Sequence, residues 1–250
     1  ELTIMKVLIL AGGMGTRISE YTKMIPKPMI KICGRPILVH IMKLYLKWGY
    51  KDFYIAGGYK NQVIKKYFKN FKKEKQKFKF TLDKKKCFVT ILNTGLKTMT
   101  GGRIRSIEKF LLKNENFMFT YGDGISNVNL KKLQKFHHKT NKLITVTAVR
   151  PPARFGEIEL KKNIVKSFKE KPQVNYGWIN GGFFIAKKEF IKFIKNGSSI
   201  LEKEPLEKAT ATKQLNAFKH YGFWKCMDTK RDKDELEKLI KQSHFKKKLG

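Results

Sequence analysis

Hydrophobic and polar positions follow two rhythms along the first 150 residues. Short apolar runs rich in β-branched and aromatic residues alternate with segments in which apolar residues recur every three to four positions. This pattern predicts a Rossmann-like α/β fold, with a mostly parallel mixed sheet and helices on both faces. We expect strands at 6–10, 52–56, 89–92, 117–121 and 143–149, and helices at 37–48, 61–68, 102–112 and 130–138.

The rhythm changes after Arg150. The lysine-dense segment 65–86 is poorly periodic and predicts a solvated, mobile excursion. No repeat or low-complexity linker divides the chain, so we expect one domain over 1–250, made of two halves, 5–150 and 151–250. In the second half we expect strands at 157–160, 164–170, 178–186 and 215–224, and helices at 187–194, 200–209 and 230–243.

Composition narrows the class of protein. With 250 residues, of which 41% are hydrophobic, the chain can bury an ordinary core. No apolar run approaches the about 20 residues that span a bilayer, so we expect a cytoplasmic protein without a membrane partner. Cys33, Cys87 and Cys226 lack the spacing of a zinc site or a disulfide framework. Residues 1–4 precede Met5 and are expected to be an extension outside the site.

The formal net charge is +35, from 55 Lys and Arg against 20 Asp and Glu. Such a charge suggests nucleic-acid binding, but the lysines are spread over almost every segment and no RNP, zinc-finger or helix-turn-helix pattern organises them. We therefore expect no nucleic-acid partner. A cationic surface can still draw anionic substrates toward a cleft.

A glycine-rich loop follows the first predicted strand, where ligands of α/β sheets bind. Gly12, Gly13 and Gly15 can present backbone amides to phosphate oxygens. Neither a dinucleotide fingerprint nor a Walker loop fits the spacing. Arg17 and the proline-flanked Lys27 add positive charge. The glycines alone would equally suit a tight turn, but the whole string favours anion binding.

Two aspartates follow predicted strands. Asp123 lies in Tyr-Gly-Asp-Gly, and Asp228 comes after the late strand. Either one alone is as well suited to capping a turn. As a pair at two strand ends, they fit a site for one Mg²⁺ ion.

The string 10–17, followed by Pro-Lys-Pro at 26–28, resembles the signature of the sugar nucleotidyltransferases. The resemblance runs in order from Lys6 to about Leu239 and implies a glycosyltransferase-A-like nucleotidyltransferase fold. In the cytidylyl branch, CTP and α-D-glucose 1-phosphate give CDP-glucose and pyrophosphate for dideoxysugar and O-antigen synthesis. The motifs that resemble this branch lie at 99–103, 119–124, 154–156, 170–172, 178–184, 204–206 and 222–229.

The resemblance also implies roles for residues. The first half would bind the nucleotide and the second half the sugar, with Mg²⁺ on Asp123 and Asp228. Glu170, Lys171 and Asn180 would hold the sugar phosphate. The implied catalytic residues are Arg17, Lys27, Asp123, Lys171 and Asp228. The implied nucleotide-binding residues are Leu10, Ala11, Gly12, Gly13, Met14, Gly15, Thr16, Arg17, Lys27, Thr98, Gly101, Gly102, Arg103 and Gly122. Thr100 is expected to cap the helix that begins near Gly102.

Two departures and two alternatives accompany the resemblance. Segment 72–89 is several residues shorter than the family pattern, and Asn93 stands where an aspartate is usual. The family forms homo-oligomers, so a hexamer or a smaller assembly is expected.

One alternative function keeps the mechanism with another base or sugar 1-phosphate. The other is an inactive scaffold that binds RNA or another polyanion, but such a module has no need of all five implied catalytic residues.

Overall fold

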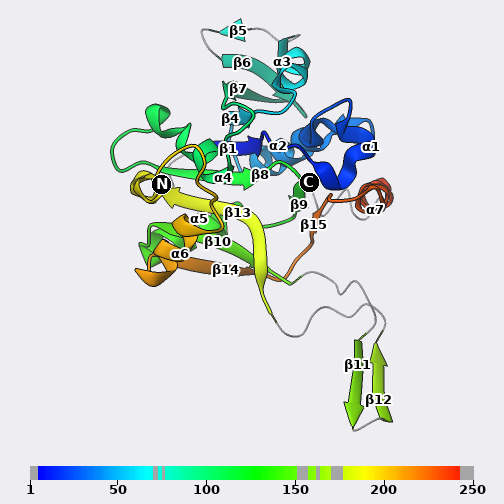
Figure 1. Ribbon diagram of the computed structural model, residues 1–250. Coiled ribbons are helices and arrows are strands. Elements are labelled where there is room, and N and C mark those ends of the chain that lie inside the picture. The colour runs from blue at the N-terminus through cyan, green and yellow to red at the C-terminus, as the bar shows by residue number, and fades with distance from the viewer. Residues whose placement is uncertain are drawn as a thin grey trace.

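The computed structural model describes residues 5–69, 73–74, 77–150, 157–161, 164–169 and 177–242. A nine-stranded mixed sheet runs through this part of the chain (Figure 1). In spatial order its strands are β14 (Leu215–His220), β10 (Ile144–Val149), β13 (Ile179–Lys187), β8 (Asn116–Tyr121), β1 (Lys6–Ala11), β4 (Asp52–Gly57), β7 (Lys85–Asn93), β6 (Lys77–Leu82) and β5 (Lys73–Glu74).

The centre of the sheet is parallel. β1 lies between β4 and β8, and all three run in one direction, as do β4 with β7 and β10 with β14. β13 is antiparallel to both β8 and β10, and β6 is antiparallel to β7. The predicted mostly parallel mixed sheet is confirmed. Strands from both predicted halves join it.

Helices cover both faces of the sheet. Val7 and Ile9 of β1 pack into one hydrophobic cluster, and Leu8 and Leu10 pack into the other, as expected for a strand buried on both sides. α2, α3, α5 and α7 contribute to the first cluster, and α4 and α6 to the second. The helices are α1 (Ser19–Thr22), α2 (Ile37–Lys47), α3 (Asn61–Lys69), α4 (Thr100–Arg105), α5 (Leu130–Thr140), α6 (Glu204–Ala211) and α7 (Lys230–Lys241).

Three small antiparallel pairs lie outside the main sheet. The pair of β9 (Gly124–Ser126) with β15 (Trp224–Cys226) joins the segments that carry the two aspartates. The other pairs are β2 (Lys31–Ile32) with β3 (Arg35–Pro36), and β11 (Glu157–Lys161) with β12 (Ile164–Lys169). No helix in the described ranges combines the length and apolar character that a bilayer crossing requires.

The excursion predicted at 65–86 is wrong over residues 77–86. Its second part forms β6 and the start of β7, which extend the sheet as an antiparallel pair. Phe80 and Leu82 are buried on this pair, while Thr81 between them is exposed. The strand alternation was present, but the lysines around it obscured it.

Several predicted boundaries also shift. The helix predicted at 102–112 is the short α4 followed by a 3₁₀ turn at Glu108–Phe110. Residues Lys188–Phe193 form a 3₁₀ helix, and the strand predicted at 215–224 is divided into β14 and β15. Thr100 does not cap α4, because the cap position is Met99 and no side chain bonds there.

Candidate active site

The glycine loop begins where β1 ends. Gly15 adopts a left-handed backbone with φ +65°, and a Cβ there would lie 2.8 Å from Thr22 Cγ2. Thr22 donates its hydroxyl hydrogen to the Gly15 carbonyl at 3.1 Å, and the Tyr59 amide donates to the Gly12 carbonyl at 3.0 Å. Gly13 is exposed and its Cβ position faces open space. The loop is therefore held at both ends, and a ligand can approach its middle.

Arg103 lies beneath this loop and is only 4% exposed. Its guanidinium donates to the carbonyls of Gly12 at 3.0 Å and Gly95 at 3.1 Å, and to the hydroxyl of Thr94. Burial lowers the pKa of this guanidinium. Within the described residues its hydrogen-bond partners are all uncharged oxygens. Arg103 thus fixes the loop from below, and a Cβ on Gly12 would collide with it, 2.0 Å from Nη1.

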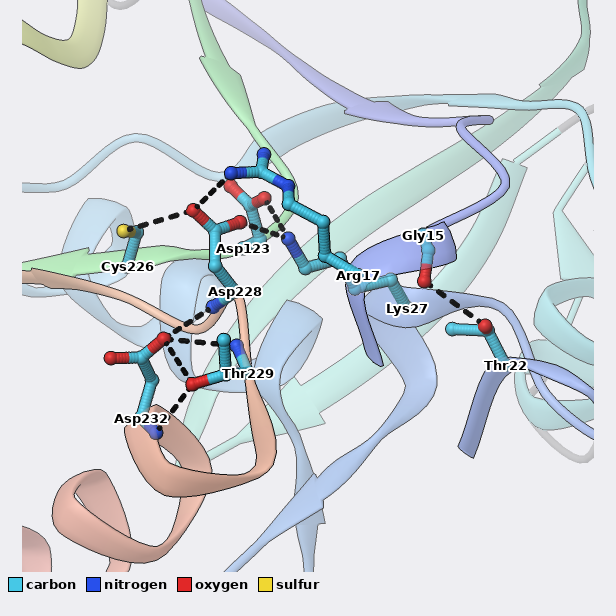
Figure 2. A network of polar contacts seen from close by, with 9 residues as sticks. All are labelled: Gly15, Arg17, Thr22, Lys27, Asp123, Cys226, Asp228, Thr229 and Asp232. Atoms are coloured by element: carbon cyan, nitrogen blue, oxygen red, sulfur yellow. Dashed lines mark hydrogen bonds and ion pairs between the residues drawn. The ribbon is translucent and has the colours of Figure 1, made fainter. Parts of the chain in front are cut away.

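Asp123 and Asp228 come together because β9 pairs with β15. The Met227 amide donates to the Asp123 carbonyl at 2.8 Å, which aligns the two acid-bearing segments. Lys27 Nζ lies 2.7 Å from Asp123 Oδ2 and 2.7 Å from Asp228 Oδ1 (Figure 2). Arg17 Nη1 lies 3.0 Å from Asp228 Oδ2. The structure thus brings together four of the five implied catalytic residues, from four separate segments.

The two cations of this cluster differ in exposure. Lys27 is 9% exposed and starts a 3₁₀ turn after Pro26. Burial by itself would lower the pKa of Lys27, but the charges and hydrogen bonds of Asp123 and Asp228 outweigh it and raise that pKa above its usual value. The Arg17 side chain is 72% exposed. Lys27 is enclosed between the two acids, whereas the exposed Arg17 side chain can turn toward a ligand.

The first turn of α7 supports Asp228. Thr229 caps this helix in a capping box: the Asp232 amide donates to Thr229 Oγ1 at 3.2 Å, and Asp232 Oδ2 accepts from the Thr229 amide at 2.9 Å. The same Oδ2 accepts from the Asp228 amide at 3.1 Å. Our sequence interpretation missed this support, although Thr-x-x-Asp before a helix is a capping signal.

Cys226 also contacts Asp228. Its Sγ lies 3.7 Å from Asp228 Oδ2. Burial, followed by the nearby aspartate charges, raises the pKa of the Cys226 thiol to about 12. The group is therefore a neutral thiol that donates weakly to the acid, and not a nucleophile at neutral pH.

The acid pair fits a hard divalent cation. Both carboxylates converge on one point, and the Lys27 ammonium occupies the place that a metal ion would take. No cluster of three or more His, Cys, Asp or Glu side chains suited to a metal occurs among the described residues. A Mg²⁺ ion at this point would therefore take its other oxygens from phosphate and water, as Mg²⁺ commonly does.

Several residues implied to bind nucleotide are packed tightly against the chain. A Cβ on Gly101 would lie 2.7 Å from the Ser199 carbonyl oxygen, and one on Gly102 would lie 2.5 Å from that of Gly197. At Gly122, a Cβ would lie 2.6 Å from the Leu10 carbonyl oxygen. These three glycines are required by close backbone packing at the edge of the site. No local pattern in the sequence indicates this reason for them.

The sugar side is described in part. Asn180 lies on β13, next to β8, and its Nδ2 donates to the Tyr121 hydroxyl at 3.0 Å. Thr98 donates its hydroxyl hydrogen to the Thr94 carbonyl, beside the Arg103 contacts. Glu170 and Lys171, and the motif at 154–156, lie outside the described residues.

Comparisons with known proteins place the chain in a family. The model of the family described as nucleotidyl transferase matches residues 6–229. The glucose-1-phosphate cytidylyltransferase of Salmonella typhimurium strain LT2 is 43% identical over 245 residues, covering 94% of this chain and 95% of that protein. The probable glucose-1-phosphate cytidylyltransferase of Bacillus subtilis strain 168 is 37% identical, covering 95% and 97%.

A solved structure shares the fold. HddC from Yersinia pseudotuberculosis superposes with a TM-score of 0.73 at 23% identity, covering 95% of this chain and all of that one. The shared fold is consistent with the family match over residues 6–229. The chain belongs to the nucleotidyl transferase family.

Proposed function

We propose that this chain is a glucose-1-phosphate cytidylyltransferase, which converts CTP and α-D-glucose 1-phosphate to CDP-glucose and pyrophosphate. The observation that carries the proposal is the cluster of Asp123, Asp228, Lys27 and Arg17 beside an open glycine loop. The choice of base and sugar is supported by 43% identity, over nearly the whole chain, to a relative with that name.

The reaction needs alignment and charge neutralisation more than acid–base chemistry. An oxygen of the sugar phosphate, already anionic, attacks the α-phosphorus of CTP, and the bond from that phosphorus to the bridging oxygen breaks. The electron pair leaves with pyrophosphate. Amides of the glycine loop and the cations of Arg17 and Lys27 would hold the triphosphate and offset the charge that develops on the leaving group.

Asp123 and Asp228 would hold Mg²⁺, which when bound neutralises phosphate charge. Lys27 now occupies the point between these acids, so its ammonium must move away when they hold a divalent cation. The nearest anionic partner for the displaced ammonium would be the triphosphate itself. Lys171 and Glu170 are assigned to the sugar phosphate by the resemblance alone.

Substrate screening tests the proposal. Purified protein is incubated with Mg²⁺, glucose 1-phosphate and one of CTP, UTP, dTTP, ATP or GTP, and released pyrophosphate is measured. We expect CTP to give the fastest release and CDP-glucose to be the product. Release with UTP or dTTP but not with CTP would contradict the choice of base. Salt-sensitive RNA binding without turnover would favour the polyanion-binding alternative.

A further reaction, GTP with mannose 1-phosphate, is added to the panel for a specific reason. A mannose-1-phosphate guanyltransferase 2 of Candida glabrata is 31% identical over 242 residues, although this chain covers only 63% of that protein. Turnover of that pair above the CTP reaction would move the proposal to the guanylyl branch.

The cellular setting extends the proposal. CDP-glucose made by this chain would supply dideoxysugars for O-antigen or related surface polysaccharide, in the cytoplasm where CTP is available. The active form would be a homo-oligomer, a hexamer or smaller, without a membrane or nucleic-acid partner. Light scattering coupled to gel filtration measures the assembly, and a monomer with full activity would contradict this part.

A further inference from the structure

A chain of hydrogen bonds links the start of α4 to Asn180 on the sugar side. The Gly182 amide donates to Asn180 Oδ1 at 2.8 Å, and Asn180 Nδ2 donates to the Tyr121 hydroxyl at 3.0 Å. The Tyr121 hydroxyl donates to Glu202 Oε1, and the Thr100 hydroxyl donates to Glu202 Oε2 at 2.9 Å. The Glu202 carboxylate thus accepts one hydrogen bond from Tyr121 and one from Thr100.

The direction of each bond is fixed by the groups at the ends. A backbone amide can only donate, so Asn180 must present its oxygen to Gly182 and its nitrogen to Tyr121. An ionised carboxylate can only accept, so the Tyr121 hydroxyl must pass its hydrogen to Glu202. Burial, followed by the Glu202 charge, raises the pKa of Tyr121 and keeps its hydroxyl protonated. The chain therefore allows one orientation of the Asn180 amide.

Packing holds the two middle members in place. Gly182 has φ +78°, and a Cβ there would lie 2.6 Å from Cδ2 of the Tyr121 ring. The edge of the same ring meets Phe184, with centroids 6.0 Å apart. Glu202 follows the fully buried Leu201, whose amide donates to Thr100 Oγ1 at 2.8 Å. The ring cannot shift without losing these contacts, whereas the exposed Glu202 carboxylate is held by the anchored backbone of Leu201 and by its two hydrogen bonds.

We propose that Glu202, acting through the Tyr121 hydroxyl, is a positioning residue that fixes the Asn180 amide and thereby sets which hexose 1-phosphate is accepted. The inference rests on the proposed function, because the resemblance assigns Asn180 to the sugar. One Nδ2 hydrogen and one Oδ1 lone pair of Asn180 remain for a ligand, and their directions are fixed. A hexose whose hydroxyl has the opposite configuration leaves them unpaired, which strongly disfavours it.

Steady-state kinetics of matched variants test this inference. Tyr121→Phe removes the hydroxyl but keeps the packed ring, and Glu202→Ala removes the acceptor. We expect each to raise the KM for glucose 1-phosphate about tenfold, with an unchanged KM for CTP and a melting temperature close to that of the wild type. Preference for glucose 1-phosphate over galactose and mannose 1-phosphates should fall by about the same factor.

Further variants separate positioning from mere structural support. Glu202→Gln retains an oxygen that accepts from Tyr121 and should recover most of the preference. The double variant of Tyr121→Phe with Glu202→Ala should be no worse than either single change, because both break the same chain. Glu207→Ala removes an exposed glutamate five positions further along the chain and should behave as wild type.

Each contrary result has a distinct meaning. If the wild type makes CDP-glucose while Tyr121→Phe and Glu202→Ala keep its hexose preference, the inference is overturned and the proposed function stands. An equal rise of both KM values with a large loss of melting temperature also overturns it. If the wild type transfers no nucleotidyl group, the proposed function fails. Calorimetric titration with glucose 1-phosphate then decides: weaker binding to Tyr121→Phe supports the inference, and equal binding or none overturns it.

Discussion

Two buried cations flank the glycine loop, and they differ in whether a carboxylate balances their charge within the described residues. Lys27 lies between two carboxylates at 2.7 Å each, so its charge is balanced within the protein. Arg103 has only uncharged oxygens as hydrogen-bond partners in the described part of the chain. Lys27 is suited to being displaced and moved onto a substrate. Arg103 is suited to holding the loop while its charge favours an anion above it.

Removing one of the carboxylates that balance Lys27 should have the largest effect on the rate. Asp123→Asn removes one of the carboxylates that face Lys27 and would hold Mg²⁺, so we expect kcat to fall about a thousandfold while circular dichroism stays unchanged. The matched control is Asp234→Asn on α7, where the side chain is 49% exposed. A wild-type rate for Asp123→Asn would show that the acids do not carry the reaction.

Removing Arg103 tests the other cation. Arg103→Met removes the guanidinium bonds to the carbonyls of Gly12 and Gly95 and leaves Gly12 only the Tyr59 amide, so the loop loses its support from below. We expect the KM for CTP to rise about fiftyfold. Arg103→Lys should recover little, because an ammonium cannot replace the guanidinium fork. Arg105→Met is the control, since Arg105 lies on the same helix as Arg103 but donates to the carbonyls of Ile194 and Lys195, away from the loop. Equal effects of the two changes on the KM for CTP would contradict a special role for Arg103.

Replacing Lys27 tests whether its charge stabilises the protein by offsetting the two carboxylates. Lys27→Met leaves Asp123 and Asp228 facing each other, and we expect the free energy of unfolding without ligands to fall by about 2 kcal/mol at neutral pH. The partly exposed carboxylates can rehydrate, which limits the loss. Mg²⁺ alone should then raise the melting temperature of the variant more than that of the wild type. An equal Mg²⁺ response would mean that the lysine and the metal do not compete.

A third buried basic residue, His137, differs from both cations because burial keeps it neutral. His137 on α5 is fully buried, and burial, followed by the charges of His138 and Lys187, lowers the pKa of His137 to about 4. Below pH 6.5 the unfolded chain binds a proton that the folded chain does not, so this group removes stability as the pH falls toward 4. We expect about 1 kcal/mol per pH unit in urea unfolding between pH 6 and 5. His137→Gln should show a flatter dependence than the exposed control His138→Gln.

The sequence predicted the parts of the molecule that depend on local pattern. The alternation of apolar runs gave the parallel centre of the sheet, and the string 10–17 gave the loop after β1. These two features need only neighbouring residues and the rule that ligands of parallel sheets bind at the strand ends. We also predicted that Asp123 and Asp228 would pair, from their places at strand ends, but the structure joins them through the antiparallel β9–β15 pair outside the main sheet.

The remaining features depend on contacts between distant segments. Lys27 meets Asp228 across 201 positions, and Tyr121 meets Glu202 across 81. Neither pair has a local signature. The direction of Arg103 likewise depends on the packing of α4 under the loop, and its sequence context is that of an ordinary helix start.

The small β9–β15 ladder has a consequence for the order in which the protein is made. The glycine loop emerges from the ribosome early, but Asp123 has no partner acid until Trp224 to Asp228 have been synthesised and have paired with β9. A nascent chain, or a fragment ending before residue 224, retains the loop and lacks the second half of its acid pair. The complete acid pair is thereby reserved for chains that extend to residue 228.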